Sequence, residues 1–475
     1  MQEKNLRIFI LLFLALIGIT VFVLWFTYNP VKDFKASVPG SDKRPLRETD
    51  SNNLVKIGEK YTFTKDFNST LTGKWAHFRG NDYDNINKEP IKLIDCFEKN
   101  EPKILWKLAM GEGHAAAAIY NGKVYVLDYN EAKKADVLKC LALGTGEELW
   151  RRSYSVHIKR NHGISRTIPA VNDKYVVSIG PKGHVMCVSS EKGDFLWGID
   201  LEKEYATEIP FWNTGQCPII ENNIAIIAPG GTSLMIGVDC ATGKVLWKTP
   251  NPNKWKMSHS SIMPMTFGGK KMFVYSAIGS VCGISAEGKD AGTLLWKTSE
   301  FGPNVVAPSP VILDNGKIFI TAGYGVGAML FQLIPSGAGF TVKVLQKYLP
   351  SEGMASEQQT PIFYKDHLFS ILPKDAGGLR DQFVCCNPSD CKKMVWTSGK
   401  DVRFGLGPYI IADGKFYILD DDGTLTIAEV STSKFKVLSK TKIMDGQDAW
   451  GPFAIADGKL ILRDSKLMIC IDIKE

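Results

Sequence analysis

The sequence predicts an all-β fold, an eight-bladed β-propeller, preceded by one N-terminal transmembrane helix. Three observations support this prediction: a repeated turn-and-strand signature, a tryptophan that recurs in phase with it, and one long apolar stretch near the N-terminus. The signature begins at Asn121, Asn172, Asn222, Gly269, Asn315, Lys365, Asp413 and Asp457. Short strands that recur every 44 to 51 residues, the spacing between these starts, are typical of propeller blades.

A tryptophan closes one strand of most repeats. It occurs at Trp106, Trp150, Trp197, Trp247, Trp296 and Trp396. The interval between Trp296 and Trp396 spans two repeats, so the missing position is expected near Leu345. In the fullest copy, GVDCATGKVLW over residues 237–247, Asp239 and CATG predict a polar turn between the third and fourth strands. A ring that recurs once per blade is more typical of packing between sheets than of ligand stacking.

The propeller is predicted to span residues 103–475 and to be closed by a strand from its N-terminal end. After the last signature at Asp457, the chain has room for a second and a third strand but carries no tryptophan-bearing fourth strand. The run KILWK, residues 103–107, is a surplus strand of this kind ahead of the first blade. We expect it to complete blade eight, because closure leaves no open seam with exposed strand edges.

Residues 8–28 are predicted to form a transmembrane signal anchor after a short tail, residues 1–7. Residues 8–26 are almost uninterruptedly apolar and carry no charge, which is long enough to span a bilayer. The bulky residues that follow do not suit a signal-peptide cleavage site. Trp25 and Tyr28 lie where interfacial aromatic residues are usually found.

Two segments join the anchor to the propeller. Residues 29–74 are polar and are predicted to be a flexible linker. Residues 75–102 form a lead segment that begins WAHFRGN. In this segment Arg79 could contact a ligand, or the segment could be an ordered cap on the propeller, and the cap is the favoured interpretation.

The pattern A-x-D-x-x-T-G-x-x-x-W, preceded by D-G-K-h-Y-h where h is apolar, resembles the repeat of pyrroloquinoline-quinone (PQQ)-type propellers. This superfamily includes quinoprotein alcohol dehydrogenases and the non-enzymatic propeller of the bacterial outer-membrane barrel assembly machine. The resemblance covers residues 75–475, and the compact blades are closest to those of the non-enzymatic members. The apolar segment predicts a single-pass membrane protein, and the resemblance implies that its propeller lies outside the cytoplasm, in the periplasm if the source is bacterial.

The ten cysteines are expected to serve mainly as small packing residues. The shared site, on the third strand of five blades, is occupied by Cys140, Cys187, Cys282, Cys386 and Cys470. The adjacent pair Cys385 and Cys386 resembles the vicinal disulfide of quinoprotein dehydrogenases, but it lies within a predicted strand. A bridge from Cys391 to either of them remains an alternative.

Candidate binding residues lie in the segments that lead into the first strand of each blade, because propeller ligands usually meet at the mouth of the central channel. The candidates are His114, His162, Arg166, Trp212, Asn213, His259, Gln358, Arg403, Asp448 and Trp450. The set is polar and aromatic, which suits binding. For each residue taken alone, a role in holding its loop is the alternative.

The sequence gives little support for catalysis. The candidate ring contains few acids, namely Glu112, Glu357 and Asp448, and no haem, HExxH or GxSxG motif is present. We therefore predict a membrane-tethered scaffold that binds a protein, peptide or glycan and needs no cofactor. The alternative is a PQQ-dependent alcohol or sugar dehydrogenase, which would need calcium and a carboxylate base. The net charge of +7 is spread along the chain, so no nucleic-acid partner is expected.

Overall fold

The computed structural model describes residues 2–28, 54–97 and 101–475, and the chain divides into two compact units, Met1–Leu54 and Val55–Glu475. The first unit contains one long helix, α1 (Gln2–Thr27). Its segment Lys4–Thr27 is long and apolar enough to cross a membrane, judged by length and composition. Most of the predicted linker, residues 29–53, lies outside the described residues.

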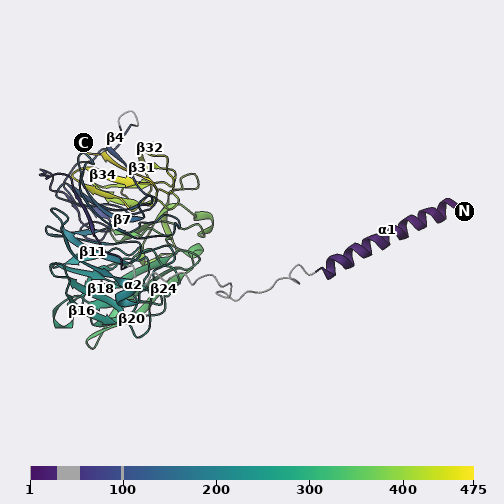
Figure 1. Cartoon of the computed structure of the whole chain (residues 1–475), viewed down its shortest axis with the longest axis horizontal. Helices are drawn as coiled ribbons and strands as arrows, with labels where there is room; N and C mark the ends of the chain where they lie inside the picture. Colours follow the sequence, from purple (N-terminus) through teal and green to yellow (C-terminus); the bar gives the residue numbers. More distant parts are fainter. Residues whose placement is uncertain (1, 29–53, 98–100) are drawn as a thin grey trace. The chain divides into compact units, whose positions relative to one another are not determined.

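The second unit is an eight-bladed β-propeller, which confirms the predicted fold class (Figure 1). Each blade is an antiparallel sheet whose four strands run from the central channel outward. Blade one comprises β5 (Ala118–Tyr120), β6 (Lys123–Asn130), β7 (Ala135–Ala142) and β8 (Glu148–Ser155), and blade two comprises β9 (Ala170–Val171), β10 (Tyr175–Ile179), β11 (His184–Ser189) and β12 (Phe195–Asp200). Blade three comprises β13 (Ile219–Glu221), β14 (Ile224–Ile227), β15 (Ser233–Asp239) and β16 (Val245–Pro250), and blade four comprises β17 (Met263–Phe267), β18 (Lys270–Ala277), β19 (Ser280–Ser285) and β20 (Leu294–Thr298).

The remaining blades follow the same plan. Blade five comprises β21 (Val311–Ile312), β22 (Lys317–Ala322), β23 (Gly327–Ser336) and β24 (Gly339–Tyr348), and blade six comprises β25 (Ile362–Tyr364), β26 (His367–Ile371), β27 (Phe383–Cys386) and β28 (Met394–Thr397). Blade seven comprises β29 (Tyr409–Ala412), β30 (Lys415–Leu419), β31 (Thr424–Glu429) and β32 (Val437–Lys442), and blade eight comprises β33 (Ala454–Ala456), β34 (Lys459–Arg463), β35 (Leu467–Asp472) and β4 (Lys103–Ala109). A short helix, α2 (Leu201–Tyr205), follows blade two.

The strand β4, which contains the KILWK run, is the outer strand of blade eight. It pairs antiparallel with β35 from Lys103 opposite Asp472 to Ala109 opposite Leu467. Figure 1 accordingly shows β4 at the end of the propeller that carries the C-terminal blades, and β35 is its neighbour in the sheet although the two are far apart in the sequence. The ring therefore closes by hydrogen bonding between its two ends, and no seam exposes the edge of β35.

The recurring tryptophans connect each blade to the next. In blade two, the Trp197 indole Nε1 donates to the carbonyl oxygen of Cys240 in blade three, at 2.9 Å. The ring lies under Gly243, which has φ +73° and whose Cβ, if present, would come within 2.7 Å of Trp197 Cγ. The T-G of the repeat therefore supplies both a left-handed turn and room for the neighbouring indole.

Blade five lacks this tryptophan, and a glutamine takes its position. Gln346 lies opposite Leu330, as Trp150 lies opposite Cys140 in blade one. The Gln346 side-chain amide donates to the carbonyl oxygens of Pro388 and Ser389 in blade six, at 3.0 and 2.9 Å. Gln346 directly follows Leu345, near which the sequence predicts the missing position. The contact between blades five and six is therefore kept, but by a glutamine in place of a tryptophan.

The structure differs from the expected flexible linker over residues 54–74. Within this segment β1 (Lys60–Phe63) pairs antiparallel with β8 and adds a fifth strand to the outer edge of blade one. The Arg152 guanidinium, which lies 4.5 Å from the Tyr61 ring centroid, also donates to the Gly58 carbonyl oxygen. Sequence composition did not reveal this pairing, because the segment is short and polar.

The lead segment enters the central channel. β2 (Lys74–Trp75) pairs antiparallel with β5, and β3 (Ile86–Asn87) pairs parallel with β29, so two innermost strands hold the segment. Because β5 and β29 run in the same direction along the channel, the chain goes in along β2 and returns along β3. We call residues 74–87 the channel plug.

Buried hydrogen bonds tie the channel plug to other blades. The Val171 amide of blade two donates to the Ala76 carbonyl oxygen at 2.8 Å. The Arg79 guanidinium donates through Nε, Nη1 and Nη2 to the carbonyl oxygens of Tyr83, Thr360 and Pro361, at 2.9, 3.0 and 3.1 Å. All three side-chain nitrogens of Arg79 thus donate to backbone carbonyl oxygens. Arg79 holds the lead segment in place, as expected if this segment is an ordered cap on the propeller.

Nine of the ten cysteines are buried, Cys96 is exposed, and none forms a disulfide in the structure. Cys385, and not Cys386, lies opposite the blade tryptophan, because the turn between β27 and β28 is one residue longer than the corresponding turn in blade one. In blade four Gly283 takes that position, one residue after Cys282. The shared packing site is therefore real in four blades, but its occupants differ from the predicted set at these two positions.

Candidate functional site

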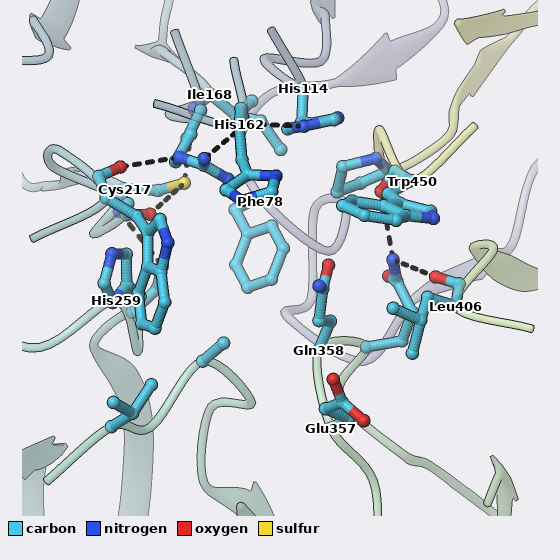
Figure 2. Close-up of a pocket in the computed structure, with 18 of the residues that line it drawn as sticks. Phe78, His114, His162, Ile168, Cys217, His259, Glu357, Gln358, Leu406 and Trp450 are labelled. Atoms are coloured by element: carbon cyan, nitrogen blue, oxygen red, sulfur yellow. Dashed lines mark hydrogen bonds between the residues drawn. The ribbon is translucent and has the colours of Figure 1, made fainter. Parts of the chain in front are cut away.

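A pocket of about 290 Å³ opens at one end of the central channel (Figure 2). Its lining is aromatic and polar, and it is drawn from all eight blades and the channel plug. The lining residues are Phe78, His114, His162, Arg166, Ile168, Trp212, Gly215, Cys217, His259, Ser261, Val305, Ala307, Tyr324, Glu357, Gln358, Gln359, Lys374, Leu406, Trp450 and Pro452. Its volume is at the lower end of the range for small-molecule sites, about 300–1,000 Å³.

The channel plug closes the inner end of this pocket. Phe78, between its β2 and β3, points into the centre of the pocket in Figure 2. The plug also bonds inner strands of blades one and seven beneath this point. We call this pocket, with the plug at its inner end, the blind well; its lining comes largely from the loops leading into the first strands.

One wall of the well is a stack of aromatic rings. Trp212 lies nearly parallel to Tyr324, with ring centroids 6.1 Å apart and an interplanar angle of 10°. His259 lies against the same indole at 6.1 Å. A Cβ at Gly215 would come within 2.7 Å of His259 Cδ2, so glycine at this position lets the imidazole lie flat on the loop.

The opposite wall is built on Trp450, which Figure 2 shows across the pocket from His259. The His114 ring stacks on this indole, with centroids 5.1 Å apart and an angle of 26°. Trp450 Nε1 donates to Asp421 Oδ1 at 2.9 Å, and the Gln359 amide donates to the Trp450 carbonyl oxygen at 3.0 Å. These bonds fix the orientation of the ring before any ligand arrives.

Arg166 is held within the first wall by backbone carbonyl oxygens. Its Nε donates to Trp212 at 2.6 Å, and its Nη2 donates to Asn161 at 3.2 Å and to His162 at 2.5 Å. Burial lowers the pKa of Arg166 to about 10, so the guanidinium is charged at neutral pH. It is the principal positive group among the aromatic rings.

Both stacked histidines are neutral at pH 7. Burial, followed by the charges of Arg166 and Arg463, lowers the pKa of His114 to about 3. Burial and the charge of Arg166 lower the pKa of His259 to about 4. His114 Nε2 donates to the His162 carbonyl oxygen at 3.1 Å, so the proton of the neutral ring resides on Nε2.

These pKa values predict a loss of stability in acid. The unfolded chain binds a proton at each histidine near pH 6.5, whereas folded His114 does so only near pH 3, so stability is present above about pH 6.5 and is lost as the pH falls. Between pH 7.5 and pH 5 each such histidine should cost about 2 kcal/mol of the free energy of unfolding. The variant His114→Gln should lose about 2 kcal/mol less than the wild type. Urea unfolding at both pH values measures this.

The matched control is His157→Gln, because His157 is exposed. This variant should lose as much stability between the two pH values as the wild type. Equal losses for His114→Gln and the wild type would contradict a neutral, buried His114.

Seven of the ten candidate residues line the pocket: His114, His162, Arg166, Trp212, His259, Gln358 and Trp450. Asn213 is buried in the loop behind it, with φ +66°. Asp448 borders a second hollow, of about 400 Å³, beside Glu112. Arg403 lies elsewhere, where it donates to the carbonyl oxygens of Arg380 and Lys400.

Thirteen of the twenty lining residues were not among the sequence candidates, and three of these, Tyr324, Lys374 and Phe78, show why. Tyr324 and Lys374 lie on connections between the second and third strands of blades five and six, which reach the same face as the loops leading into the first strands. The unusually long connection between β26 and β27 was a usable signal for Lys374. Phe78 belongs to the channel plug, and no repeat pattern could place it.

The donor set of the pocket does not fit a calcium–quinone centre. Calcium needs six to eight oxygen ligands, commonly from several carboxylates, whereas Glu357 is the one carboxylate among the lining residues. Within residues 2–28, 54–97 and 101–475, no cluster of three or more His, Cys, Asp or Glu side chains could hold a metal ion. Cys385 and Cys386 lie within β27, in different packing clusters, and neither lines the pocket.

Comparisons with known proteins agree with the fold. A family model described as outer membrane protein assembly factor BamB matches residues 133–333, which is less than half of the chain. No curated protein matches by sequence.

Solved propellers match by shape at low identity. BamB from Moraxella catarrhalis is 11% identical, with a TM-score of 0.50 over 78% of this chain and 98% of that one. A europium-containing methanol dehydrogenase is 11% identical, with a TM-score of 0.55 over 84% and 89%. The computationally designed Ika8 protein is 14% identical, with a TM-score of 0.50 over 78% and 99%. The protein is thus an eight-bladed β-propeller whose residues 133–333 match the BamB family model and whose fold is similar to that of BamB.

Proposed function

We propose that this chain is a membrane-anchored binding scaffold that engages a protein partner over the open face of its channel. The observation that carries the proposal is the blind well, which has rigid aromatic walls and a single carboxylate. A preformed aromatic site of this kind suits binding, whereas it lacks the oxygen ligands of a quinoprotein centre.

An exposed ledge of aromatic rings extends the well onto the surface. Phe211 is 79% exposed and Tyr324 is 60% exposed, and both pack against Trp212 in the pocket wall. We call Phe211, Trp212 and Tyr324 the aromatic ledge. Exposed, rigid aromatic side chains are typical of the energetic centre of protein interfaces. A partner that fills the well would therefore also cover this ledge.

The anchor and the location of the propeller are part of the proposal. The apolar helix α1 is long enough to span a bilayer. The matched BamB family model is described as an outer membrane assembly factor, which supports a propeller outside the cytoplasm. In this arrangement the propeller would hold its partner near the membrane surface.

Site-specific photocrosslinking tests the proposed binding face. A benzophenone amino acid at Tyr324 in the full chain should crosslink one partner protein in stoichiometric yield. The same group at Leu246 should not, because Leu246 is exposed on the outer strand β16, away from the channel. The purified partner should then bind the wild-type chain in a 1:1 complex.

Matched substitutions complete this test. Removing an exposed aromatic residue at a binding centre costs about 2 kcal/mol or more, so Tyr324→Ala should weaken the complex by more than about tenfold. Leu246→Ala should leave it unchanged. Equal crosslinking at both sites, or a complex that tolerates Tyr324→Ala, would refute the proposed face. Dye reduction with added quinone, calcium and alcohols would instead establish the dehydrogenase alternative.

A further inference from the structure

Two buried arginines, Arg79 and Arg463, and the half-buried Arg166 differ in how completely they are bonded. Arg79 donates through all three side-chain nitrogens to backbone carbonyl oxygens. Arg463 does the same, with bonds of 2.8 to 3.2 Å from Nε, Nη1 and Nη2. In Arg166 only Nε and Nη2 are engaged. Among the described residues its Nη1 has no partner, and it belongs to a side chain that lines the well.

No carboxylate compensates the charge of Arg166. Within the described part of the chain, no Asp or Glu oxygen lies within ion-pair distance of its guanidinium. The neighbour that acts on its pKa besides burial is the Tyr324 phenol. Burial raises the pKa of Glu357, the one carboxylate of the well, and the charge of Lys374 partly opposes this shift. Even a half-buried cation loses part of its hydration, and proteins usually pair such a charge or use it.

The histidine rings near Arg166 add no charge, and the other cation that lines the well, Lys374, neighbours Glu357. His114 and His259 are both neutral at pH 7 and belong to the two walls that face each other across the well. The three backbone carbonyl oxygens fix the plane of the guanidinium and commit two of its three nitrogens. The single free nitrogen suits one carboxylate, because a phosphate dianion would need further cationic donors.

We propose that Arg166 is the anchoring point for an acidic side chain of a protein partner, an Asp or Glu on a loop that enters the well. This inference rests on the proposed function and specifies its chemistry. The carboxylate accepts from Arg166 Nη1, and the aliphatic or aromatic neighbour of the acidic residue lies on the aromatic ledge. The ledge favours a peptide over a free small anion, because a free anion would leave Phe211 and Tyr324 uncovered.

Two matched peptide probes test this assignment on the full chain. The probes are acetyl-Phe-Glu-Phe-amide and acetyl-Phe-Gln-Phe-amide, which differ in charge and little else, with binding measured by ligand-observed NMR titration at pH 7. For the wild type the Glu probe should bind at least fivefold more tightly than the Gln probe. In Arg166→Gln this ratio should fall to about one, whereas in Arg403→Gln it should remain, because Arg403 lies outside the well.

A salt titration keeps the test decisive if Arg166→Gln does not fold. In the wild type, added sodium chloride should weaken the Glu probe and leave the Gln probe unchanged. Equal affinity for both probes, no binding of either probe, or a ratio that survives Arg166→Gln would overturn the inference. Acetate binding as tightly as the Glu probe would show that the site recognises a small anion alone, which would also overturn the inference. The Tyr324 crosslink decides the proposed function separately, since it does not depend on Arg166.

Discussion

Removing residues 1–110 should unfold the propeller, whereas removing residues 1–54 should leave its melting temperature unchanged. The longer truncation deletes β4, which provides six pairings with β35 and closes the ring. It also deletes Trp106, whose indole Nε1 donates to the Leu143 carbonyl oxygen of blade one at 2.8 Å. The shorter truncation removes only the separate N-terminal unit. Circular dichroism melts of the two chains measure the difference.

Single substitutions in β4 separate closure from the loss of other N-terminal contacts. Trp106→Ala should lower the free energy of unfolding by about 3–5 kcal/mol, a large part of the 5–15 kcal/mol of a typical domain. Ile104→Ala, on the same strand but 37% exposed, should cost less than about 1 kcal/mol. Similar effects for the two variants would show that the strand does not lock the ring.

Arg79→Ala should be the most damaging change in the channel plug. It leaves the carbonyl oxygens of Tyr83, Thr360 and Pro361 without their donor in a buried site. Each unsatisfied buried group costs about 1–3 kcal/mol, so we expect a loss of about 3–5 kcal/mol in the free energy of unfolding. Urea denaturation of the full chain measures it.

Arg403→Ala is the matched control for this change. Arg403 also donates to backbone carbonyl oxygens, but its bonds are exposed to water, which can replace them. Its loss should stay within about 0.5 kcal/mol. If Arg79→Ala were no more harmful than Arg403→Ala, the plug would not be a stabilising part of the channel.

The fold was predictable because its determinants are local and repeated. The turn at Asp239, the glycine after it and the tryptophan that follows recur in phase, and each repeat builds one blade. The register could not be read to the residue. In blade six the turn between β27 and β28 is one residue longer than the corresponding turn in blade one, which moves the packing position from Cys386 to Cys385.

The candidate site was predictable only as far as propeller topology determines it. The loops ahead of the first strands place His114, Arg166 and Trp212 together, because all such loops reach one face. Phe78 could not be found this way, since its position depends on pairing between β2 and β5 that has no periodic signal. Nor could the sequence distinguish Arg166 from Arg403, because the difference lies in which carbonyl oxygens surround each guanidinium.

The pairing of β4 with β35 also determines when the ring can close during synthesis of the chain. Lys103 and Asp472, which pair at one end of this ladder, are 369 residues apart in the chain. At a synthesis rate of about 5–20 residues per second, β4 waits roughly 20–70 s for its partner. During that interval β2 can already join β5, whereas β3 must wait for β29. Assembly of this ring is therefore complete only when the last blade has been made, and until then β4 remains an unpaired strand edge.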